Sequence, residues 1–173
     1  MMKIRIKFRK YGTMKFIGHL DVMRYFQKAI RRSEVNIRYS EGFSPHQIMS
    51  FAAPLGVGIT SKGEYVDIEV LDTENSKKMI DRLNAVMSEG FEILEYKLLP
   101  DDAANAMSIV AAADYSLVFR PGYEPEKESP EEWFEKLVRF FDADHVMIMK
   151  KTKKGEREMD LKPFVYELNV RKN

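Results

Sequence analysis

The 173-residue chain contains no cysteine and only three histidines. Without cysteine it can form no disulfide bond, and it offers no thiolate to a zinc ion or an iron–sulfur cluster. The histidines leave one formal metal site, a set of two histidines and one carboxylate made of His19, His46 and Asp21. Because His19 and Asp21 lie two positions apart at a helix start, where side chains do not face each other, we expect no metal site and no cofactor.

The sequence also lacks a long apolar segment. No stretch reaches the roughly 18 apolar residues of a membrane-spanning helix, and the N-terminal residues alternate charged with apolar side chains, unlike a signal peptide. The glycine pattern of a nucleotide-binding loop is missing as well. We therefore expect a cytoplasmic protein that makes no membrane contact.

Charge is unevenly distributed, although the net charge is only +1. Residues 1–60 carry eleven Lys and Arg against three Asp and Glu, which makes this part +8. The remainder has 17 basic and 24 acidic residues and is therefore −7. Such a distribution attracts a polyanion to one face, unless the two parts of the chain attract each other instead.

The first part of the chain mixes strand and helix patterns. Helices are predicted over 19–32 and over a second segment, which is capped within 73–76 and closed by Gly90. Strands are predicted over 2–11, 35–39, 64–71 and 91–99, and one interrupted strand is predicted over 48–53 and 58–60. A hairpin turn is expected at 61–63. The resulting β-α-β-β-α-β order predicts an α+β protein with a ferredoxin-like unit over residues 1–99, in which two helices cover one face of a four-stranded antiparallel sheet.

Residues 100–112 are predicted to connect this unit to a second, partial unit over 113–173. The pattern predicts a strand over 113–120, a helix that begins at a capping box on Ser129, a hairpin of 145–151 with 156–161, and an extended segment over 164–170. The helix is expected to bury its apolar side chains, Trp133, Phe134, Leu137, Val138 and Phe141. The order is β-α-β-β without the second helix, which a truncated C-terminus would explain.

The helix predicted over 19–32 has two chemically different faces. Its apolar stripe comprises Leu20, Met23, Phe26 and Ile30, and its basic arc comprises Arg24, Lys28, Arg31 and Arg32. A basic arc of this kind suits the phosphates of a nucleic acid. The alternative is a helix face that is simply solvated.

The segment that follows, SEGFSPH from Ser40 to His46, has the glycine, proline and hydroxyl side chains of a loop. Aromatic side chains in and beside it, Tyr39 and Phe43, could stack on nucleic-acid bases. We expect His46 to be partly exposed, and its titration near neutral pH suits a functional site. The alternative is that His46 braces the loop through a hydrogen bond.

Similarity to a known family lies in GHLDVMR (18–24), AIRRSEV (29–35), YSEGFSPHQIMSFAAPLGVG (39–58) and the tripeptide 63–65. These segments resemble the radical SAM-linked family of uncharacterised bacterial proteins, most densely over residues 3–70. The resemblance implies partnership with, or fusion to, a cobalamin-binding radical SAM protein, and it implies no reaction for this chain. Because the chain has no cysteine to hold a cluster, radical chemistry would belong to the partner.

Three functions fit these patterns. We favour an RNA-binding or substrate-positioning module that works with a radical SAM enzyme in RNA modification, with tRNA or ribosomal RNA as its ligand. Its expected contacts are Arg24, Lys28, Arg31, Arg32, Arg38, Tyr39, Phe43 and His46. The second function is docking to the radical SAM protein without RNA, anchored by Phe43 and Phe51. The third is an RNA-modifying or RNA-cleaving enzyme with Asp21 as nucleophile or His46 as general acid or base.

Overall fold

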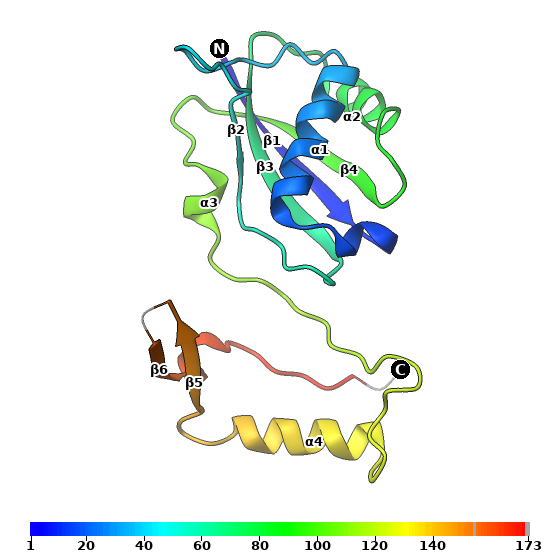
Figure 1. Ribbon diagram of the computed structural model, residues 1–173, viewed down its shortest axis with the longest axis vertical. Coiled ribbons are helices and arrows are strands. Elements are labelled where there is room, and N and C mark those ends of the chain that lie inside the picture. Colours follow the sequence, from blue (N-terminus) through cyan, green and yellow to red (C-terminus); the bar gives the residue numbers. More distant parts are fainter. Residues whose placement is uncertain (154, 172–173) are drawn as a thin grey trace. The chain divides into compact units, whose positions relative to one another are not determined.

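The computed structural model of the protein describes residues 1–153 and 155–171 (Figure 1). The chain divides into two compact units, residues 1–113 and residues 114–173. In the part of the chain that the structure describes, every helix is too short or too polar to cross a lipid bilayer.

The first unit contains a four-stranded antiparallel sheet with the strand order β2-β3-β1-β4. Its strands are β1 (Met2–Lys10), β2 (Met49–Phe51), β3 (Ser61–Val70) and β4 (Phe91–Leu99). Its helices are α1 (His19–Arg32), α2 (Ser76–Asn84) and α3 (Ala106–Ile109), with a 3-10 turn, η1, at Gly12–Phe16. The prediction of an α+β protein is therefore confirmed.

The core of this unit lies between the sheet and its two longer helices. Period-two alternation in β1 points Ile4, Ile6 and Phe8 to the buried side, where each is at most 1% exposed. Figure 1 shows α1 lying along one face of the sheet. One apolar cluster joins that face to both helices and includes Val22, Phe26 and Ile30 of α1 with Met79 and Leu83 of α2.

The predicted hairpin turn at 61–63 is wrong, and so is the strand at 58–60. Residues 61–63 belong to β3, because Lys10 at the end of β1 pairs with Ser61 and extends the ladder to that point. The edge strand β2 pairs with β3 only over Met49–Phe51. The intervening residues 52–60 form an irregular connection in place of a tight turn.

The second unit comprises α4 (Pro130–Phe141), a two-stranded sheet of β5 (Met147–Thr152) and β6 (Gly155–Asp160), and a 3-10 turn, η2, at Lys162–Phe164. The capping box on Ser129 and the hairpin are confirmed. The predicted turn of this hairpin includes Lys154, which lies outside the described residues.

Two predictions for the second unit are wrong. Residues 113–120 are not a strand, because no described strand pairs with them; Phe119 instead packs on Trp133 and Phe134 of α4, with ring centroids 5.2 Å apart in each case. The apolar side of α4 is not fully buried either, since Trp133 is 37% exposed and no residue of the helix is buried. The described part of this unit offers only a two-stranded sheet, which is too small to cover a helix face.

Candidate functional site

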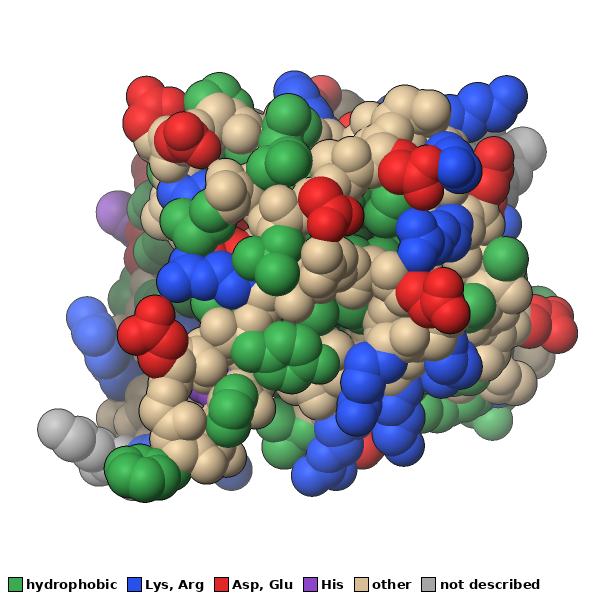
Figure 2. Space-filling view, turned by 90° about the horizontal axis from the view of Figure 1, so that it is seen from above, with side chains coloured by type: hydrophobic (Ala, Val, Ile, Leu, Met, Phe, Trp, Pro, Cys, Tyr) green, Lys and Arg blue, Asp and Glu red, His purple; other side chains and the backbone are tan. Residues whose placement is uncertain are grey.

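The outer side of α1 carries the four predicted cations. Val22, Phe26 and Ile30 pack into the core, which turns the opposite side of the helix outward. The predicted apolar stripe is wrong at its first position, because Leu20 is 66% exposed and Val22 packs in the core instead. Viewed from above, the molecule shows a group of neighbouring Lys and Arg side chains at the lower centre of Figure 2.

Within the described residues, three of these four cations have no carboxylate partner. Arg24 forms an ion pair with Asp21 at 3.3 Å, and both side chains are exposed. Arg31 and Arg32 donate hydrogen bonds to backbone carbonyl oxygens. Lys28 is exposed and makes no ion pair with any described residue. Lys28, Arg31 and Arg32 therefore carry uncompensated charge, and we call these three residues the α1 basic face.

Three cations of β1 are arranged differently, because they are paired across strands. Arg5, Lys7 and Arg9 of β1 each contact a carboxylate on β3 or β4. Arg38, one of the predicted RNA contacts, pairs with Glu69 of β3 at 2.8 Å. The charge of Arg38 is thus largely neutralised within the fold, and this residue contributes less to an anion-binding surface than the α1 basic face does.

The loop Ser40–His46 is closed by its two end residues. The Ser40 hydroxyl lies 2.8 Å from Nδ1 of His46 and accepts a hydrogen bond from the His46 backbone N–H, while the Ser40 N–H donates to the His46 carbonyl. His46 is exposed, as predicted, and it also braces the loop. Phe43 at the tip is fully exposed, and Tyr39 beside the loop is 45% exposed.

A buried glutamine joins this loop to α1. The side-chain amide of Gln47 donates to the Gln27 carbonyl of α1 at 3.2 Å and lies 3.4 Å from the Tyr39 hydroxyl. The loop and the helix therefore form parts of one surface.

The other predicted site residues are placed less favourably. Phe51 lies in the core at 7% exposure, so it has no surface to offer a partner protein. Asp21 is exposed and bound to Arg24, and the structure shows no contact between Asp21 and His46. Among the residues that the structure describes, no three His, Asp or Glu side chains gather in a way that could hold a metal ion.

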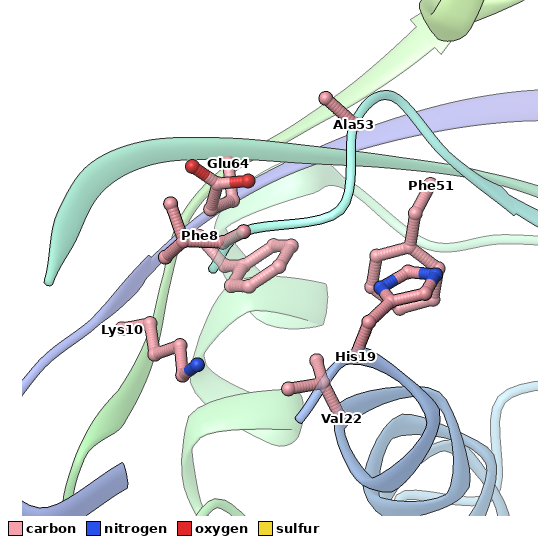
Figure 3. A pocket seen from close by; sticks show the side chains of 8 residues that line it. Phe8, Lys10, His19, Val22, Phe51, Ala53 and Glu64 are labelled. Atoms are coloured by element: carbon pink, nitrogen blue, oxygen red, sulfur yellow. The ribbon is translucent and has the colours of Figure 1, made fainter. Parts of the chain in front are cut away.

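Sequence reasoning missed a small cavity at the beginning of α1 (Figure 3). Its walls are Phe8, Lys10, His19, Val22, Phe51, Ala53, Leu55 and Glu64. The imidazole of His19 meets the Phe51 ring edge-on, with ring centroids 5.4 Å apart. The cavity therefore combines aromatic and apolar walls with three titratable side chains.

Lys10 is the unusual member of this set, because its side chain is 1% exposed. It follows Ile4, Ile6 and Phe8 on the inward side of β1. Its ammonium group donates to the Ile17 carbonyl at 2.9 Å and, within the described residues, forms no ion pair. Burial lowers the pKa of Lys10 below its ordinary value, and the charge of Glu64 acts in the opposite direction.

Comparison with known proteins assigns the family. Residues 3–173 match a family described as uncharacterised proteins conserved in bacteria (DUF2344), so the chain belongs to that family. No curated protein matches the chain.

Proposed function

We propose that this member of the DUF2344 family is a cytoplasmic RNA-binding module that positions RNA for a radical SAM partner enzyme. The α1 basic face is the observation that supports the proposal most directly. Three neighbouring cations stay exposed and without carboxylates there, while Arg5, Lys7 and Arg9 of the sheet are paired. Cations that no carboxylate neutralises keep their charge for an external anion.

The surroundings of the α1 basic face suit RNA better than they suit a simple anion. Phosphates bind to Lys and Arg with little dependence on sequence, whereas unpaired bases stack on aromatic rings. Tyr39 and Phe43 supply exposed rings on the surface that Gln47 joins to α1. A single strand can therefore lie with its phosphates on α1 and one or two bases on the loop.

We further propose that the first unit is ferredoxin-like. The antiparallel strand order β2-β3-β1-β4 and the shared core of α1, α2 and the sheet support this assignment. The fold itself implies no activity, so the function is argued from the surface alone.

Partnership with a cobalamin-binding radical SAM protein explains why a module without cysteine would present RNA. Phe43 favours a protein contact at the same loop, because a fully exposed aromatic ring is a typical interface anchor. In this arrangement Phe43 contacts the partner, and Tyr39 with the α1 basic face holds the RNA. Docking to the partner without RNA is the second candidate function.

The RNA proposal is tested by the salt dependence of binding. The binding constant of the full chain for a fluorescent single-stranded RNA is measured between about 50 and 200 mM salt. Replacing Lys28, Arg31 and Arg32 together by glutamine should weaken binding and lower the slope of log K against log salt by about 2, since each phosphate contact contributes about 0.7.

A matched control removes the same charge elsewhere. Lys62, Lys77 and Lys97 are exposed and lie outside α1, and their triple glutamine variant should leave the slope nearly unchanged. Equal losses of RNA affinity in the two triple variants would mean that binding depends only on the net charge of the protein. The α1 basic face would then be abandoned as the RNA-binding surface.

The partner proposal needs a separate measurement. The purified chain is mixed with a cobalamin-binding radical SAM protein from the same organism, and association is followed by light scattering. Phe43→Ser should weaken the complex by at least about tenfold, as expected for an interface anchor worth about 1.4 kcal/mol. An undiminished complex would place the protein contact on another surface.

A further inference from the structure

The strand β4 leaves one of its long edges free in the first unit. It stands at the end of the strand order and pairs only with β1. The beginning of its free edge is covered, because the side chain of Asn84 donates to the Ile93 carbonyl and accepts from the Ile93 N–H, at 3.0 and 2.8 Å. Over 94–98 the described residues provide no such cover, and we call this segment the open edge. An uncovered edge is a template for a further strand.

The side chains of the open edge also have unused contact area. Leu98 is 55% exposed, although it lies opposite Ile4 of β1 and therefore on the face of the sheet that the helices cover. On the other face, Lys97 is exposed and forms no ion pair with any described residue. Glu95 binds Lys7 through one carboxylate oxygen and is itself 58% exposed. An added strand would cover the apolar side chain and give both charged ones a partner.

We propose that two copies of the chain associate through the open edge, with this segment of one copy antiparallel to the same segment of the other. The pairing is centred on Tyr96, so that Glu95 of each copy lies opposite Lys97 of the other. On the opposite face, Leu98 of each copy lies opposite Leu94 of the other. Both copies then contribute the same surface around a two-fold axis, and the two four-stranded sheets join into one.

Charge complementarity selects this register over its neighbours. Opposed residues of an antiparallel pair turn their backbone groups the same way, so a symmetric pairing must be centred on a residue. Centring on Glu95 would place two carboxylates directly opposite each other, and centring on Lys97 would do the same with two ammonium groups. Centring on Tyr96 replaces these repulsions by two attractive pairs. The open edge is therefore complementary to itself, which favours a second copy of this chain over an unrelated strand.

The contact is small, which sets the expected strength of the dimer. The open edge has the length of one ordinary strand, and its pairing buries less area than the roughly 1,600 Å² of a typical stable complex. Association should therefore depend on concentration, with monomers at about 1 µM and dimers toward about 1 mM. The α1 basic face belongs to a different element of the first unit, so dimer formation goes beyond the RNA-binding function and does not depend on it.

The proposal is tested by sedimentation velocity on the full chain between about 1 µM and about 1 mM, where the mass should rise toward that of two chains. Lys97→Glu would set two carboxylates against each other at both symmetric positions of the dimer, and it should weaken association by at least about tenfold. Lys62→Glu makes the same charge change at an exposed position of β3 and should leave association unchanged.

A mixture of two variants tests the register itself. Glu95→Lys and Lys97→Glu should each fail to associate with themselves, whereas the mixture restores both attractive pairs and should form a heterodimer. A chain that stays monomeric at about 1 mM, a dimer that is indifferent to Lys97→Glu, or two variants that do not associate on mixing would overturn the proposal. If Glu95→Lys fails to fold because it faces Lys7, the comparison of Lys97→Glu with Lys62→Glu decides by itself.

Discussion

Asp67 holds the segment before α3 on the sheet, and its removal should destabilise the first unit measurably. Its carboxylate accepts two hydrogen bonds from Arg5, each 2.8 Å long, and one from the Ala106 backbone N–H at 2.7 Å. The Arg5 and Asp67 side chains are only 16% and 15% exposed, and the hydrogen bonds that Arg5 donates to Asp67 raise the pKa of Arg5. Asp67→Ala therefore leaves the Arg5 guanidinium with only its hydrogen bond to the Ala104 carbonyl, and the Ala106 amide without this acceptor, in a partly buried place.

The expected cost is about 2 to 3 kcal/mol of unfolding free energy, below the figure for a fully buried pair because some solvent remains. For a unit of this size it corresponds to a fall in Tm of about 10 °C, measured by circular dichroism. Amide hydrogen exchange at Ala106 should also lose its protection.

A matched control comes from the next pair on the same strand. Lys7 and Glu95 lie 3.0 Å apart, but Glu95 is 58% exposed, so Glu95→Ala should cost less than about 1 kcal/mol. If the two alanine variants lowered Tm equally, burial would not be what makes the Asp67 contact strong, and the reasoning above would fail.

Three further predictions concern protonation and loop closure. Burial lowers the pKa of Lys10, so the unfolded state binds this proton more tightly; the unfolding free energy from urea titration should rise as the pH increases toward 10.5, and Lys10→Met should lack that rise. The hydrogen bond from His145, with two backbone amides, holds the pKa of Asp160 at about 2, below its ordinary 3.8. Its stabilising contribution should therefore be lost as the pH falls from 3.8 to about 2, and Asp160→Asn should abolish this acid dependence in circular dichroism. Ser40→Ala removes the hydroxyl that accepts from the His46 amide, and faster exchange of that amide should reveal the opened loop, while an unchanged rate would show that the Ser40 hydroxyl does not protect it.

Local patterns predicted most elements of the first unit closely. The helix 19–32 and the strand 91–99 were predicted with the bounds that the structure shows, because each has a strong period and clear stop signals. The connection before β3 was mispredicted, since its limits depend on how far β1 and β3 pair across the sheet. Such pairing is set by contacts distant in sequence, which local alternation does not contain.

The candidate site, too, could be predicted from the sequence only in part. The cations of α1 follow from helical spacing, but only the structure shows that Arg38 is paired and the α1 basic face is not. The burial of Lys10 could have been predicted, because Lys10 continues the inward alternation of β1 after Phe8. The position of Glu64 near Lys10 could not have been predicted, since it depends on the register of two strands that are far apart in the chain.

The cations of the first unit differ in how they are paired. On the outer face of the sheet, Arg5, Lys7 and Arg9 of β1 are matched to carboxylates on neighbouring strands, and these cross-strand pairs favour the observed register. The α1 basic face has no carboxylate partner among the described residues; Arg31 and Arg32 contact only backbone carbonyl oxygens through their hydrogen bonds. Lys10 is buried without an ion pair among the described residues, which carries a desolvation cost. Departures from a consistent local pattern concentrate at functional positions, which is why the RNA-binding proposal is placed on the α1 basic face.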